Sequence, residues 1–216
     1  MALQPLYFVV VAFWPFVWWL IFFGMYRGWE HRSRYQKVAL TVLPHLTTWL
    51  LGVLLYFNLP VLKSTRIFSV ETLAFLGIIS GLLLALLLSK GQCQFWRLPV
   101  QQPRRFLVQG GVISITSVAE EIIWRGFFFV SLLDLLSFPI ALAALASSIW
   151  FGLEHMHQGW KMLPMYILIG GVFCMLFIFT GNLIAPVTAH IAYNLAIVGP
   201  KLGDAVNTAS ARGDSP

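Results

Sequence analysis

Residues 106–136, FLVQGGVISITSVAEEIIWRGFFFVSLLDLL, decide the fold class of this chain. The stretch is long and apolar enough to cross a hydrocarbon core, which requires about 20 mostly apolar residues in a helix. A helix also satisfies its own backbone polar groups in lipid, whereas an open strand does not. The sequence therefore predicts a membrane-embedded helix here, and the charged residues inside it need an explanation.

Six further apolar runs accompany this stretch, at residues 5–26, 38–62, 67–89, 138–156, 162–180 and 183–199. Of the 216 residues, 59% are hydrophobic and only 10% are charged, far below the roughly one quarter of charged residues in a soluble domain. We predict an all-α polytopic transmembrane bundle of about seven helices. Residues 1–200 are expected to form a single transmembrane domain, and the polar tail 201–216 is expected to be disordered.

The net charge of +6 comes from short basic clusters between apolar runs. Such clusters follow the positive-inside rule, so no nucleic-acid partner is expected. The clusters at 27–37 and 90–105 predict that the N-terminus lies outside and the C-terminus lies in the cytoplasm. The first run lacks a preceding basic residue and a small-residue cleavage site, so we expect a retained helix. The small size of the protein and the lack of organelle signals favour a bacterial plasma membrane.

The densest group of charges lies in the segment Ala119-Glu120-Glu121-Ile122-Ile123-Trp124-Arg125. A charge at the bilayer centre costs at least about 2.5–3.5 kcal/mol. Glu121 and Arg125 are four residues apart, so they share a helical face and can form an ion pair. Glu120 points about 100° away, and a desolvated carboxyl there suits a general base. From this segment alone, a helix-packing network of all three side chains is an equally good interpretation.

The run 138–156 ends with a histidine that shares a helical face with an aromatic ring. Phe151 and His155 are four residues apart, so the ring can shield the imidazole from lipid. For a lone histidine near a helix end, simple placement at the membrane interface is the better interpretation. Glu154 and His157 fall on other faces, where we expect them to meet headgroups or water.

The last apolar run carries His190 and Asn194, which are again four residues apart and project together. Two hydrogen-bond donors on one face suit an oxyanion pocket in a water-poor site. The alternative is interhelical hydrogen bonding, worth about 0.6–2 kcal/mol in membranes. The three polar sets in three separate runs together favour a catalytic site in the C-terminal half.

These patterns resemble the three motifs of the CAAX protease and bacteriocin-processing (CPBP/Abi) family of intramembrane endopeptidases. In this sequence the motifs read Glu120-Glu121-x-x-x-Arg125, Phe151-x-x-x-His155 and His190-x-x-x-Asn194. They occur in the family's order, and the resemblance covers roughly residues 104–200. It implies an intramembrane endopeptidase that acts on a membrane-associated or lipid-modified peptide.

The resemblance also implies roles for the individual residues. Glu120 and His155 match the pair that activates a water molecule, and His190 and Asn194 match the positions that stabilise the oxyanion. Supporting roles fall to Glu121, Arg125 and Phe151. Eukaryotic relatives trim the residues after a prenylated cysteine, whereas bacterial relatives act in peptide processing, bacteriocin self-immunity and signalling.

Metal dependence and two other functions remain open at this point. We commit to no cofactor, because the His-Glu-x-x-His signature of zinc proteases is absent. If a divalent metal such as zinc takes part, Glu120, His155 and His190 are its expected ligands. A membrane transporter would also place ionisable residues in the bilayer, although no internal repeat supports it. A non-catalytic immunity or scaffold protein is the third interpretation.

Overall fold

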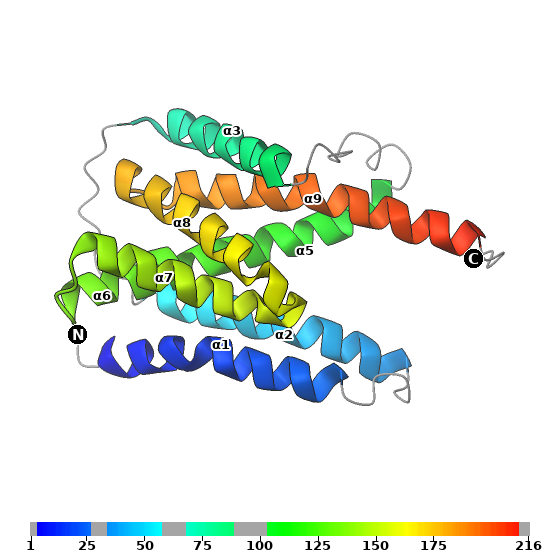
Figure 1. The fold of residues 1–216 in the computed structure, drawn as a ribbon, viewed down its shortest axis with the longest axis horizontal. Helices are drawn as coiled ribbons and strands as arrows, with labels where there is room; N and C mark the ends of the chain where they lie inside the picture. The colour runs from blue at the N-terminus through cyan, green and yellow to red at the C-terminus, as the bar shows by residue number, and fades with distance from the viewer. Residues whose placement is uncertain (1–3, 27–33, 58–67, 89–102, 212–216) are drawn as a thin grey trace. The chain divides into compact units, whose positions relative to one another are not determined.

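The computed structural model describes residues 4–26, 34–57, 68–88 and 103–211. Within these ranges it contains helices and no strand, which confirms the all-α class (Figure 1). The helices are α1 (Gln4–Tyr26), α2 (Arg34–Tyr56), α3 (Val70–Leu88), α5 (Pro103–Glu121), the π-helix η2 (Ile122–Phe129), α6 (Val130–Asp134), α7 (Ile140–Glu154), the 3-10 turns η3 (His155–Gln158) and η4 (Trp160–Met162), α8 (Leu163–Thr180) and α9 (Ile184–Ala211).

The helices follow the seven predicted apolar runs, because α5, η2 and α6 together occupy the run 106–136. Among the described residues, three stretches are long and apolar enough to cross a membrane, namely Val70–Leu88, Phe106–Asp134 and Trp160–Thr180. The helical backbone of α9 reaches Ala211 and so enters the tail that the sequence predicts to be disordered. Most residues of the two predicted cytoplasmic loops, 27–33 and 89–102, lie outside the described part of the chain.

Contacts divide the chain into two compact units, and each is described by itself. The first unit combines Met1–Ile67 with Val118–Leu183, and the second combines Phe68–Ser117 with Ile184–Pro216. The boundary crosses α5 between Ser117 and Val118. The first two sequence motifs therefore belong to the first unit, and the third motif belongs to the second.

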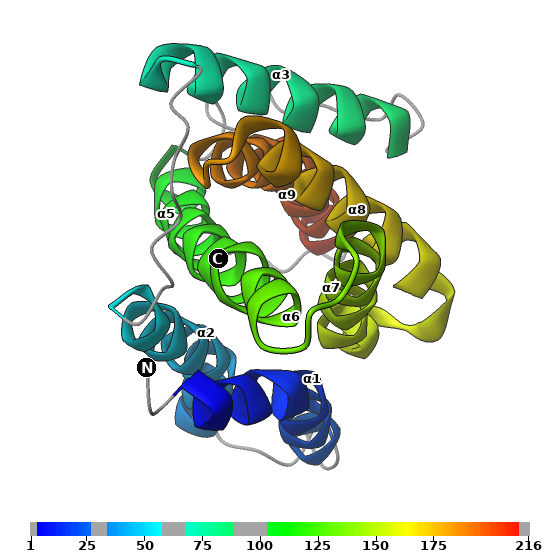
Figure 2. The same ribbon diagram turned by 90° about the vertical axis from the view of Figure 1, so that its left-hand side faces the viewer.

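In the first unit, α7 and α8 lie side by side and pack through glycine (Figures 1 and 2). A Cβ atom on Gly152 would lie 2.6 Å from Cγ1 of Ile167, and one on Gly170 would lie 3.0 Å from Cδ1 of Phe151. These glycines let the two backbones approach closely, as small residues do between membrane helices. The close packing brings the backbone of α8 next to Phe151, the first residue of the second motif.

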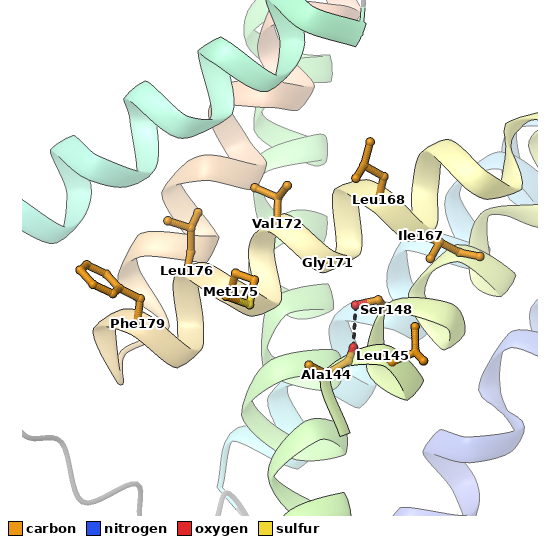
Figure 3. Close-up of a pocket in the computed structure, with 10 residues that line it drawn as sticks. All are labelled: Ala144, Leu145, Ser148, Ile167, Leu168, Gly171, Val172, Met175, Leu176 and Phe179. Carbon is orange, nitrogen blue, oxygen red and sulfur yellow. Dashed lines mark hydrogen bonds between the residues drawn. The ribbon is translucent and has the colours of Figure 1, made fainter. Parts of the chain in front are cut away.

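Residues of α7 and α8 also line a groove of about 720 Å³ (Figure 3). Its lining is almost entirely apolar and includes Leu145, Val172, Met175 and Phe179. Met175 and Phe179 are also among the most exposed large side chains, at 61% and 69%. An apolar face of this kind is suited to hydrocarbon rather than to water.

In the second unit, α3 lies along α9 (Figures 1 and 2). Gly77 and Gly81 are four residues apart on α3 and face Ala185 and Ala189, which have the same spacing on α9. A Cβ atom on Gly81 would lie 2.1 Å from the backbone oxygen of Ala189, so no larger side chain fits. This is the small-xxx-small packing of membrane helices. It fixes α9 against α3 at Ala189, the residue before the third motif.

Candidate active site

The first motif lies where α5 gives way to a π-helix. Glu120 and Glu121 are the last two residues of α5, and Arg125 is in the middle of η2. A π-helix has one extra residue per hydrogen-bonded turn, is rare, and occurs often at functional sites. Its side chains from Ile123 to Phe129 are all buried. The sequence pattern predicted a helix here but not this change of winding.

Arg125 is completely buried and contacts three parts of the first unit. Its Nη1 atom donates to Oε1 of Glu121 at 3.1 Å, which confirms the predicted ion pair. Its Nη2 atom donates to the backbone oxygen of Gly170 in α8 at 2.9 Å. The guanidinium carbon lies 4.6 Å from the ring centroid of Phe151 and 5.6 Å from that of Phe173. Such cation–π contacts stabilise a buried charge.

The second motif places an imidazole against two aromatic rings. The ring centroid of His155 lies 4.6 Å from that of Phe151, as the spacing of four predicted, and 4.5 Å from that of Tyr166 in α8. The Nδ1 atom of His155 hydrogen-bonds to the backbone oxygen of Phe151 at 2.9 Å. Because a carbonyl only accepts, Nδ1 carries the proton in this bond, and Nε2 is the basic nitrogen of the neutral ring.

The first two motifs are joined through contacts within the first unit. Arg125 pairs with Glu121 and lies over Phe151, and the Phe151 ring in turn contacts His155. Glu120 is buried, with 9% of its surface exposed, and lies within electrostatic reach of Glu154, Glu121 and Arg125. These side chains therefore form one contiguous set that includes His155 and the neighbours of Glu120, the expected general base.

The expectation that Glu154 meets headgroups or water is wrong. Its side chain is only 5% exposed. The Nε1 atom of Trp124 donates to its Oε2 at 2.6 Å, and the Nε1 atom of Trp14 donates to its Oε1 at 3.2 Å. Helical spacing could not show this, because both tryptophans come from other helices. The available signal was the position of a carboxylate inside an apolar run, which by default marks a functional residue.

The third motif lies on α9 in the second unit. His190 is buried, with 2% of its surface exposed. The amide nitrogen of Asn194 donates to the hydroxyl oxygen of Ser117 at 3.0 Å, and that hydroxyl donates to the backbone oxygen of Ile113 at 2.9 Å. This chain fixes the orientation of the Asn194 amide, which carries a second N–H on the same nitrogen. Ser117 was not predicted as a site residue.

Comparison with known proteins connects this geometry to a family. The family model described as "Type II CAAX prenyl endopeptidase Rce1-like" matches residues 103–196, a segment that contains all three motifs. The matched segment is less than half of the chain, and it is similar to the Rce1-like family. No match was found among curated proteins or among solved structures. The match supports a CAAX-type intramembrane endopeptidase in general, and together with the three apolar helices it points to an integral membrane protein.

The metal ligands expected from the sequence, Glu120, His155 and His190, belong to different units of the chain. Within the part of the chain that the structure describes, no group of three or more His, Cys, Asp or Glu side chains is arranged to hold a metal ion. Metal dependence is therefore a matter for a chelation experiment.

Proposed function

We propose that this protein is an intramembrane endopeptidase that hydrolyses a peptide bond in a membrane-associated or lipid-modified peptide, with Glu120 and His155 activating the water. One observation carries the proposal. The buried Arg125 pairs with Glu121 and lies over Phe151, so the residues next to Glu120 and His155 form one contact network. A network of this kind holds catalytic groups in a fixed geometry.

In the proposed reaction, Glu120 accepts a proton from water while the water oxygen attacks the carbonyl carbon of the peptide. The basic Nε2 atom of His155 orients the same water. The tetrahedral intermediate then collapses as the C–N bond breaks and the proton passes to the leaving nitrogen, which gives a carboxylic acid and an amine. The burial of Glu120 supports this role, because a carboxylate with little surrounding water is a stronger base.

His190 and Asn194 are proposed to donate hydrogen bonds to the oxyanion of the intermediate. The burial of His190 and the bond from Asn194 to Ser117 support this assignment, because preorganised donors in a water-poor site stabilise developing negative charge. Glu121, Arg125 and Phe151 are proposed to support the pair that activates the water.

The test is cleavage of a membrane-associated substrate co-expressed with single variants. We expect Glu120→Gln and His155→Ala to abolish cleavage while expression is retained. His157→Ala, two residues from His155, and Glu71→Gln, an exposed glutamate in the first turn of α3, are the matched controls and should cleave normally. Unchanged cleavage in both site variants would refute the glutamate mechanism.

Substrate class and metal dependence can be read in the same assay. A prenylated peptide and its unmodified form should be compared side by side, because the family description names prenyl endopeptidases. We propose a metal-free mechanism, for which activity persists in EDTA and in 1,10-phenanthroline. A loss that added zinc reverses would instead place a metal in the reaction.

A further inference from the structure

We infer that Glu154 is a positioning residue for the proposed reaction: its buried carboxylate, held by Trp14 and Trp124, fixes the place of His155 relative to Glu120. This inference rests on the proposed function. It assigns a role to a residue that lies outside the three family motifs and whose location the sequence predicted wrongly.

The geometry around Glu154 joins three helices at one carboxylate. Glu154 is the last residue of α7, and the 3-10 turn that begins with His155 follows directly. Trp14 belongs to α1 and Trp124 to η2, and each donates its indole N–H to a different carboxylate oxygen, at 3.2 Å and 2.6 Å. The residue before His155 is thus anchored to two other elements of the first unit.

The bond between Glu154 and Trp124 also connects the end of α7 to the first motif. Trp124 lies one residue before Arg125 and four residues after Glu120, within the same continuous helical stretch. The hydroxyl of Ser147 in α7 donates to the backbone oxygen of Trp124 at 2.9 Å, which adds a second bond between α7 and η2. The Trp124–Glu154 bond therefore fixes the end of α7 against the segment that carries the proposed base.

The chemistry of the site requires a carboxylate rather than an amide. Both oxygens of Glu154 accept an N–H, and an indole can only donate. A glutamine has one accepting oxygen and one donating nitrogen, so one of the two indoles would face another donor. A buried donor without an acceptor is costly, and the end of α7 must shift to relieve the conflict.

The experiment measures kcat, KM and unfolding temperature of the full-length protein in detergent for Glu154→Gln and Trp124→Phe. The matched control is Trp150→Phe. The Trp150 indole donates to the backbone oxygen of Ala12 at 2.8 Å, so this variant also loses an indole bond between α7 and α1, without touching Glu154. We expect kcat to fall about tenfold or more in both test variants with KM within about twofold, and Trp150→Phe to keep the wild-type kcat.

A second substitution distinguishes a positioning role of Glu154 from a role in helix packing. Adding Trp14→Phe to Glu154→Gln removes one indole, and the remaining bond from Trp124 can then be accepted by the glutamine oxygen. The double variant should regain most of the lost kcat. A role limited to helix packing predicts no such recovery, because the double variant has lost more interactions than the single one.

The results separate this inference from the proposed function. If Glu120→Gln abolishes cleavage but Glu154→Gln behaves like Trp150→Phe, or loses affinity alone, the positioning role is overturned and the proposed function stands. If Glu120→Gln still cleaves, the proposed function fails and the role of Glu154 fails with it.

Discussion

Replacing Arg125 with methionine tests the network that joins the first two motifs. The guanidinium is fully buried, is 3.1 Å from Glu121, is 2.9 Å from the backbone oxygen of Gly170 and lies over Phe151. Methionine fills much of the same space without a charge. Removing one partner of a buried ion pair costs about 3–5 kcal/mol, because the other charge stays in a medium of low polarity. In a chain of this size that loss corresponds to a fall in Tm of about 6–20 °C.

The double variant Glu121→Met/Arg125→Met should be more stable than the single one. It removes both charges, and apolar replacements of a buried pair are often neutral. The remaining deficit is the lost hydrogen bond to Gly170, worth about 0.5–1.5 kcal/mol. Recovery of stability on a second substitution would show that the burial of an uncompensated charge dominates the cost.

The assay is thermal unfolding of the detergent-purified protein, followed by circular dichroism of the helices. Arg104→Met is the matched control, because Arg104 is an exposed arginine in the first turn of α5. It should change Tm by little. The reasoning is refuted if Arg125→Met shifts Tm no more than Arg104→Met does, or if the double variant is less stable than the single one.

Two further predictions concern packing and pH. Gly81→Ala should destabilise the protein by about 1–3 kcal/mol, because its Cβ would lie 2.1 Å from the backbone oxygen of Ala189. Gly111→Ala, which meets nothing within 4 Å, should instead stabilise α5 by up to about 1 kcal/mol, and equal shifts in Tm for the two variants would contradict the packing argument. Burial lowers the pKa of His157 below its ordinary value of 6.5, so the folded state favours the neutral ring and this part of the stability is lost as the pH falls below that value. The loss of Tm between about pH 7.5 and about pH 5.5 should therefore be smaller in His157→Gln than in the wild type, and an equal loss would count against it.

Local sequence patterns predicted the helices of this protein and some of the contacts within them. Apolar runs of sufficient length gave the helices, because a helix in lipid must satisfy its own backbone. The spacing of four gave the Glu121–Arg125 ion pair and the contact of Phe151 with His155, because such residues share one helical face. The motifs predicted a resemblance to CAAX-type endopeptidases, and the family match over residues 103–196 supports this resemblance.

The tertiary structure alone decided which distant groups meet. Glu154 is bonded to Trp14, 140 residues away in the sequence, and Arg125 is bonded to the backbone of Gly170, 45 residues away. Hydropathy and helical spacing report on neighbours within one helix, whereas these bonds depend on how the α7–α8 pair, α1 and the π-helix pack together. For the same reason the sequence placed the Glu154 carboxylate in water, and the fold placed it in the interior of the first unit.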